Sequence, residues 1–245
     1  MKNGLITSWR ADHFRVSLFS GVNWDFEPKA VFASVFGIQP ESTGQKASLG
    51  ESSAVGSWDS LRVEVKRTLN RVDFIVQPVP DQLQVVQLPT LSDLGELLPK
   101  FTSIVGQWIA GQAQEITRLA IGCGALLPTE NNAQSYLRLK ELIRVIEIDA
   151  ARFRDMQFQV NLPVKATAVP ELLVNRISSW AAIEFHFKLM APTAEQPAVT
   201  SYFSTCSIDV NTDAARVVAF DPSVLPLVLG ELCQKAIEIL DNGIE

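Results

Sequence analysis

The chain has 245 residues, of which 47% are hydrophobic and 20% charged, with 21 Lys and Arg residues against 27 Asp and Glu residues. This composition excludes an intrinsically disordered chain, a collagen-like repeat and a small disulfide scaffold. The net charge of −6 also argues against a nucleic-acid binder whose whole surface is basic.

The sequence also bears on the compartment. The segment from Met1 to Arg10 has no apolar stretch of the kind found in secretory signals. No apolar run approaches the roughly 20 residues that a transmembrane helix needs. Three widely spaced cysteines are typical of reduced thiols. We therefore expect a soluble, cytoplasmic protein of bacterial type with no membrane association.

The first forty residues predict strands. Phe14, Val16 and Leu18 alternate with polar residues, and the apolar run 31–38 is interpreted as a second strand. Residues 41–57 contain five Ser, one Thr and three Gly, which is too little apolar surface for a core segment. We expect a flexible loop or lid there.

A β-hairpin follows this loop. Leu61, Val63 and Val65 alternate with charged residues, the chain turns near 69–71, and Val72, Phe74 and Val76 return. This alternation predicts one face in a core and the other in water. Three prolines then mark a connector over about 77–90.

Three helices are predicted. The first covers about 91–110, with a capping box formed by Thr90 and Asp93 and a kink or break at Pro99. The second covers about 134–148. The third covers about 222–241, between the cap Asp221 and Gly243. Its apolar stripe is predicted to pack onto the sheet and consists of Leu225, Leu229, Leu232, Ala236 and Leu240.

Further strands are expected at 116–125, 156–165, 172–190 and 202–210. The order of elements lacks a strict βαβ alternation, so we predict an α+β fold: antiparallel sheet with amphipathic helices packed on one face. The halves 1–112 and 113–245 each end in a long helix, and they could be two diverged sheet-plus-helix units or one continuous domain.

Gly122-Cys123-Gly124 is the motif most suggestive of catalysis. It could be a GxG turn that approaches a phosphate, but no third glycine opens a helix as a dinucleotide site requires. It could instead place a cysteine nucleophile on a tight turn, for which His13 or His186 would have to act as the base. The alternative, that these small residues serve packing, is favoured. His13 and His186 lack metal-ligand spacing, and common catalytic signatures are missing, so we expect no metal or cofactor.

Basic residues form two sets along the chain. The first set lies in the hairpin and contains Arg62, Lys66, Arg67 and Arg71. The second set covers 138–154 and contains Arg138, Lys140, Arg144, Arg152 and Arg154. Each set could contact an acidic partner or a phosphate backbone. A solvated face is favoured, because the chain is acidic overall and lacks interleaved exposed aromatic residues. Residues 221–245 contain five acids against one lysine, so the charge is polarised in a way that suits an oriented interface.

Asn175 and Arg176 lie within an apolar run. Polar groups in such a run need hydrogen-bond partners if they are buried, and an unpaired buried arginine is costly. We expect Arg176 to pair with a carboxylate in the fold or to reach a ligand or partner.

These features favour a non-enzymatic interaction or assembly subunit of a larger intracellular complex, which binds protein partners or associates with itself. The expected partner-binding residues are Arg62, Lys66, Arg67, Arg71, Asn175 and Arg176. The first alternative is a nucleic-acid-associated subunit that uses the hairpin 62–71 and the face 138–154. The second is an enzyme with Cys123 as the nucleophile.

Overall fold

A computed structural model describes residues 8–79, 88–112, 114–187 and 199–245. Its elements in the first half of the chain are β1 (Arg10–Ser20), α1 (Pro28–Phe36), β2 (Ser42–Lys46), the 3-10 turn η2 (Ala47–Leu49), β3 (Glu51–Trp58), β4 (Leu61–Arg67), β5 (Arg71–Gln77) and α2 (Leu94–Ala110). Those of the second half are β6 (Ile116–Thr129), α3 (Asn132–Leu142), β7 (Gln157–Asn161), β8 (Val164–Lys165), β9 (Leu173–Phe187), β10 (Val199–Thr212), the 3-10 turn η3 (Pro222–Val224) and α4 (Leu225–Asn242).

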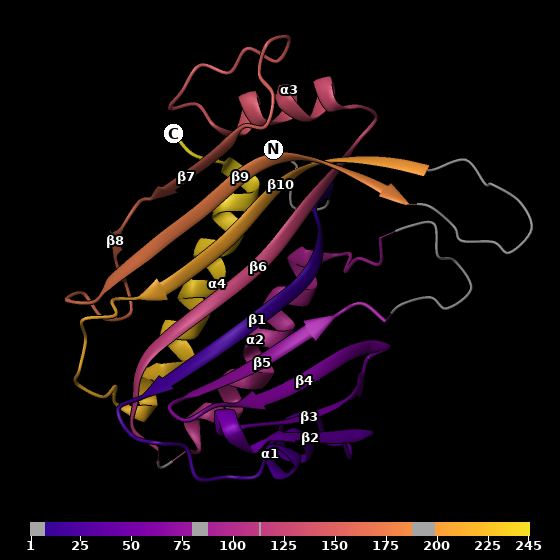
Figure 1. Ribbon diagram of the computed structural model, residues 1–245. Helices are drawn as coiled ribbons and strands as arrows, with labels where there is room; N and C mark the ends of the chain where they lie inside the picture. Colours follow the sequence, from indigo (N-terminus) through magenta and orange to yellow (C-terminus); the bar gives the residue numbers. More distant parts are fainter. Residues whose placement is uncertain (1–7, 80–87, 113, 188–198) are drawn as a thin grey trace, which may run out of the picture.

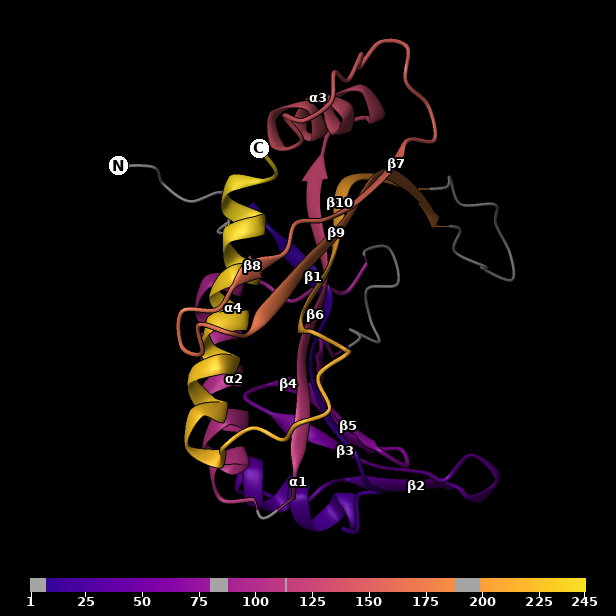
Figure 2. The ribbon, with the colours of Figure 1, turned by 90° about the vertical axis from the view of Figure 1, so that its left-hand side faces the viewer.

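All ten strands belong to one antiparallel sheet of order β2-β3-β4-β5-β1-β6-β10-β9-β7, with β8 paired to β9 (Figure 1). The long helices α2 and α4 lie side by side on one face of it (Figure 2). The predicted α+β class, an antiparallel sheet with helices on one face, is confirmed. None of the described helices is long and apolar enough to span a bilayer.

The two halves of the chain place corresponding elements in corresponding positions. In the first half β1 is followed across the sheet by β5, β4 and β3, and in the second half β6 is followed by β10, β9 and β7. Each half ends in one of the long helices. The halves meet where β1 pairs with β6, with Val16 opposite Ile121, so one sheet runs through both.

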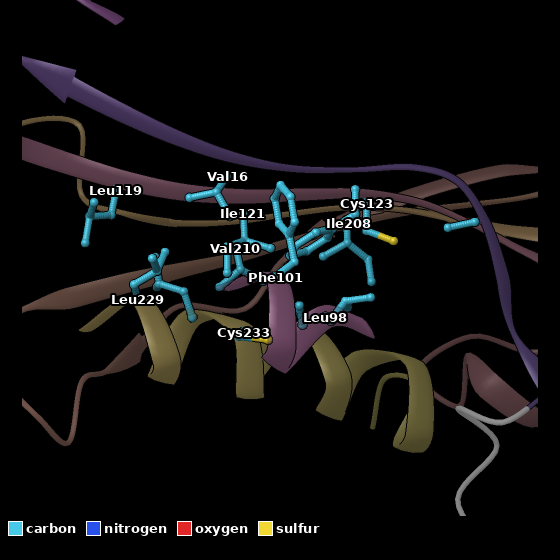
Figure 3. Close-up of a cluster of buried hydrophobic side chains, with 14 of the residues drawn as sticks. Val16, Leu98, Phe101, Leu119, Ile121, Cys123, Ile208, Val210, Leu229 and Cys233 are labelled. Atoms are coloured by element: carbon cyan, nitrogen blue, oxygen red, sulfur yellow. The ribbon is translucent and has the colours of Figure 1, made fainter. Parts of the chain in front are cut away.

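The core lies between the sheet and the helix pair. Alternate residues of the central strands, such as Val16 and Ile121, point toward α2 and α4, and Figure 3 shows them facing Leu98, Phe101 and Leu229. The stripe predicted on the last helix is buried as expected: Leu225, Leu229, Leu232, Ala236 and Leu240. The alternating apolar residues of the strands and the apolar stripe of the helix thus form one apolar layer.

The strand predicted at 31–38 is wrong, because these residues form most of α1. Pro28 occupies the first helical turn and Gly37 ends the helix in the left-handed conformation, with a φ of 71°. These local start and stop signals, together with burial of Val31, Phe32 and Phe36, outweigh the strand preference of the apolar run.

The flexible loop predicted over 41–57 is also wrong, because it contains the hairpin β2–β3. Ser52, Ala54 and Gly56 form the inner face of β3. A Cβ on Gly56 would lie 2.8 Å from the Cζ atom of Phe32, so the small residues let α1 approach the sheet closely. The small residues that suggested a loop are therefore the ones that this close contact requires.

The helices differ from prediction at three points. Asp93 adopts a left-handed φ of 52° and makes no side-chain cap, so the expected capping box is absent at the start of α2. Pro99 lies inside α2, which is continuous rather than broken. The second helix stops at Leu142, since Ile143 forms a parallel bridge with Ile244. Parts of the predicted connector (80–87) and of the predicted strand 172–190 (188–190) lie outside the described residues.

Candidate functional site

The sheet has one face that none of the described helices covers, and we call it the uncovered face (Figure 2). α1 contacts β3 and β4, and α3 contacts β9, β10 and β6, on the same side as α2 and α4. In the four central strands the side chains of the uncovered face are mostly polar or small. They include Arg15, Ser17, Phe19, Arg71, Asp73, Arg118, Ala120, Gly122, Asp209 and Asn211.

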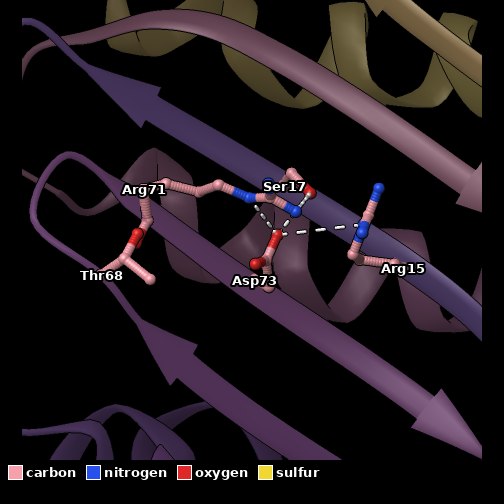
Figure 4. A network of polar contacts seen from close by, with 5 residues as sticks. All are labelled: Arg15, Ser17, Thr68, Arg71 and Asp73. Carbon is pink, nitrogen blue, oxygen red and sulfur yellow. Dashed lines mark hydrogen bonds and ion pairs between the residues drawn. The ribbon is translucent and has the colours of Figure 1, made fainter. Parts of the chain in front are cut away.

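Asp73 is the centre of a polar network on this face (Figure 4). Its side chain is only 7% exposed. The hydroxyl of Ser17 donates to Asp73 Oδ1 at 2.5 Å, and Arg71 Nε donates to the same oxygen at 2.8 Å. Arg15 Nε lies 3.9 Å from it. A buried carboxylate is stabilised by such neighbours, so the network fixes β5 to β1.

Two arginines flank the ring of Phe19. The guanidinium carbon of Arg71 lies 5.3 Å from the ring centre and that of Arg118 lies 4.9 Å from it. Both are cation–π distances. The Nε atoms of Arg118 and Arg15 are buried without a hydrogen-bond partner. We call Arg15, Arg71 and Arg118, together with Phe19 and Asp73, the arginine cluster.

The charge of the arginine cluster is not balanced by its ion pairs. Among the described residues Asp73 is the one carboxylate within ion-pair distance of any of the three guanidinium groups, and it reaches only those of Arg15 and Arg71. No ion pair joins Arg118 to any residue that the structure describes. The cluster therefore holds ordered cations with unused hydrogen-bonding capacity.

A chain of amides crosses the other half of the uncovered face. Asn161 donates to Asn175 at 2.9 Å, Asn175 donates to Asn211 at 3.2 Å, and Asn211 donates to Asp209 at 2.9 Å. These bonds link β7, β9 and β10. The predicted site residue Asn175 therefore has structural partners on both sides and stays partly accessible.

The structure divides the predicted partner-binding residues between the two faces. Arg62, Lys66, Arg71 and Asn175 lie on the uncovered face. Lys66 forms an ion pair with Glu51 at 2.9 Å. Arg67 points to the helix side and donates to the carbonyl oxygen of Phe26 at 2.6 Å, so its side chain holds the segment before α1 against β4.

Arg176 also lies on the helix side of β9, opposite Val210. Its Nε is buried without a hydrogen-bond partner, and no described carboxylate lies within ion-pair distance. The expected internal carboxylate partner is therefore not found among the described residues.

Sequence reasoning missed Arg15, Phe19 and Arg118. The alternation in β1 places Arg15 and Phe19 on the face opposite Val16, which is a signal that was present in the sequence. Arg118 gave no such signal, because only the pairing of β6 with β1 brings it beside Phe19.

The second basic set is dispersed and partly neutralised. Arg138 pairs with Glu141 at 2.8 Å, and Arg144 contacts Glu245. Arg154 donates to the backbone oxygen of Phe153 at 2.6 Å. α3, which contains Arg138 and Lys140, packs on the helix side of the sheet, whereas Arg62, Lys66 and Arg71 lie on the uncovered face. The two basic sets therefore do not form one continuous track.

Cys123 does not lie on an exposed turn. It is 1% exposed within β6 and faces the helices. Burial, together with the charge of Asp12, raises the pKa of its thiol far above the usual range. A thiol held neutral and out of contact with solvent is not a competent nucleophile, which argues against the cysteine-enzyme alternative.

The glycines on either side of Cys123 leave space on the uncovered face. A Cβ on Gly122 would lie 3.2 Å from a terminal nitrogen of Arg15, and one on Gly124 would lie 2.1 Å from Asp12 Oδ1. The two glycines therefore provide the space in which Arg15 and the Asp12–His13 pair lie on the sheet. His13 Nδ1 is 2.6 Å from Asp12 Oδ1. No cluster of three or more potential metal ligands occurs within the described part of the chain.

A groove of about 420 Å³ lies between α2 and α4 on the outer side of the helix layer. Its lining consists mainly of small and apolar residues, among them Gly106, Ala110 and Gly230, together with uncharged polar residues such as Gln107, and contains no charged residue. Its lining holds no acid or base that could activate the hydroxyls of Thr102 and Ser103 or the thiol of Cys233, and Cys233 is buried.

The buried thiols predict a stability that falls at alkaline pH. Burial raises the pKa of Cys233 to about 11, from a usual value of 9.0. The pKa values of Cys123 and Cys206 are also raised by burial. Above pH 9 the unfolded chain releases thiol protons that the native state retains, so stability is full below that pH and decreases as the pH rises. Each thiol contributes up to about 1.4 kcal/mol per pH unit.

Urea unfolding of the wild type and of Cys233→Ala at pH 8 and pH 10.5 tests this expectation. The stability advantage of the wild type over Cys233→Ala should shrink at the higher pH, because alanine does not titrate. An advantage that stays constant between the two pH values would contradict a raised pKa at Cys233.

Comparisons with protein-family models, curated proteins and solved structures find no match to this chain.

Proposed function

We propose that this protein is a non-enzymatic interaction subunit that binds a protein partner through the uncovered face of its sheet. The supporting observation is the one-sided architecture: all four described helices lie on one face, while the other face presents ordered polar side chains. Oriented, partly buried charges of this kind suit electrostatic recognition of a partner.

The nucleic-acid alternative receives less support. A phosphate backbone requires an extended basic track, and the described basic residues of the hairpin and of α3 lie on opposite faces of the sheet. Asp209 also places a carboxylate beside the centre of the uncovered face, opposite Gly122.

Site-specific photocross-linking tests the proposal. A photoreactive amino acid at Ser207, which is exposed on the uncovered face, should give a discrete protein adduct in cells that produce the protein at its native level. The matched control carries the same group at Gln234, exposed on the outer side of α4, and should give none.

The outcome discriminates between the hypotheses. An adduct at Ser207 that protease removes and nuclease leaves unchanged supports a protein partner. A nuclease-sensitive adduct supports the nucleic-acid alternative instead. Absence of any adduct at Ser207, or equal adducts at both positions, would contradict docking on the uncovered face.

A further inference from the structure

The arginine cluster has a more specific recognition capacity than the rest of the uncovered face. Its guanidinium groups come from three adjacent strands, since Arg71 lies on β5, Arg15 on β1 and Arg118 on β6. Stacking on Phe19 holds Arg71 and Arg118, and the space above Gly122 holds Arg15. The cations are therefore positioned before any ligand binds, which lowers the entropic cost of binding.

These cations lack sufficient anionic partners in the described structure. Asp73 pairs closely with Arg71, lies 3.9 Å from Arg15 and does not pair with Arg118. Guanidinium groups bind oxyanions through paired N–H donors, and carboxylates match their planar geometry. An external carboxylate group would thus supply the charge that this cluster lacks.

The surroundings favour an acidic peptide segment over a nucleic acid. Binding of single-stranded nucleic acid commonly uses aromatic rings on which bases stack. The ring of Phe19 is flanked by two guanidinium groups, so it is not free for such stacking. Toward β10 the charge changes sign at Asp209, which would repel a phosphate backbone that continued across the sheet.

We propose that Arg15, Arg71 and Arg118 form a receptor site for an acidic peptide segment that carries two or more adjacent carboxylates. This inference rests on the proposed function, because it specifies the chemistry of the partner that docks on the uncovered face. Phe19 acts as the rigid support of the site, and Asp73 orients Arg71 within it.

Fluorescence anisotropy with a labelled hexaglutamate peptide tests the site. The wild type should bind this peptide at low ionic strength, and binding should weaken as salt is added. The double variant Arg15→Gln/Arg118→Gln should bind about tenfold more weakly or worse, because it loses two charge-assisted contacts. Neither arginine has a close ion pair in the fold, so the thermal unfolding of this variant should stay near that of the wild type.

A matched control carries the same change of charge away from the cluster. Arg152→Gln/Arg154→Gln alters two exposed arginines of the segment after α3 and should reduce hexaglutamate binding less than about twofold. Arg118→Lys keeps the charge and loses the planar donor pair, so its affinity should fall between the wild type and the cluster variant.

Three results would overturn the inference: no hexaglutamate binding at low salt, equal losses in the two double variants, or tighter cluster-dependent binding of a labelled oligothymidine than of hexaglutamate. The photocross-linking at Ser207 is independent of these measurements. A protein adduct there without hexaglutamate binding would refute the acidic-segment site and leave the proposed docking face intact.

Discussion

Replacing Phe101 with alanine is expected to destabilise the protein by about 3–5 kcal/mol, because a large core side chain is removed and leaves a cavity. Phe101 is fully buried on α2. Its ring lies 5.8 Å from that of Phe14 on β1, 6.1 Å from that of Phe36 on α1 and 5.9 Å from that of Trp58 on β3. One side chain thus joins four elements of the first half.

Thermal and urea unfolding measure this loss. The melting temperature should fall by on the order of 10 °C for a chain of this size. Leu227→Ala is the control, because Leu227 lies on α4 with 63% of its surface exposed and should change stability by less than about 0.5 kcal/mol. Equal stability of the two variants would contradict the central position of Phe101.

Replacing Gly243 with alanine is expected to destabilise the protein by about 3 kcal/mol or more. Gly243 follows α4 with a φ of 67° and a ψ of −142°, a region that is nearly restricted to glycine and costs other residues about 1–3 kcal/mol. A Cβ there would also lie 2.0 Å from the carbonyl oxygen of Leu142. Since that atom belongs to the backbone of α3, it cannot turn aside as a side chain would.

The consequence of this clash is local as well as global. Ile244 N donates to the carbonyl oxygen of Leu142 at 2.7 Å, and Ile244 is buried. Alanine at position 243 should therefore release the chain end and increase hydrogen exchange at Ile244.

Gly230 provides the matched control for Gly243. It lies within α4, and a Cβ there would meet no atom within 4 Å. Gly230→Ala should stabilise the helix by about 0.5–1 kcal/mol. Similar effects of the two substitutions would show that the chain end does not pack as described.

Local patterns predicted much of this fold. The alternation of apolar and polar residues in β4 and β5 and the apolar stripe of α4 each lie within one continuous segment. The glycine that ends α4, Gly243, follows directly after the helix. The same alternation separates Lys66 from Arg67, because successive strand residues point to opposite faces. Parity alone could therefore have assigned Arg67 to the helix side, where it binds the carbonyl of Phe26.

Other features depended on contacts between distant residues. The composition of 41–57 indicates a loop when considered alone, yet Gly56 belongs to a strand because Phe32 of α1 packs against it. The apolar run after Pro28 satisfies either a strand or a helix, and its burial against β3 and β4 selects the helix. Local preference is weak compared with the burial of an apolar face.

The amino-acid sequence by itself determined the α+β class, the hairpin β4–β5 and the amphipathic helix α4, since period, caps and charge are local properties. Only the tertiary structure decided the arginine cluster: Arg71 and Arg118 are 47 residues apart in the chain, and both contact Phe19 because β1 pairs with β5 on one side and β6 on the other. Strand order is set by how the whole apolar surface is buried, and no single segment encodes it.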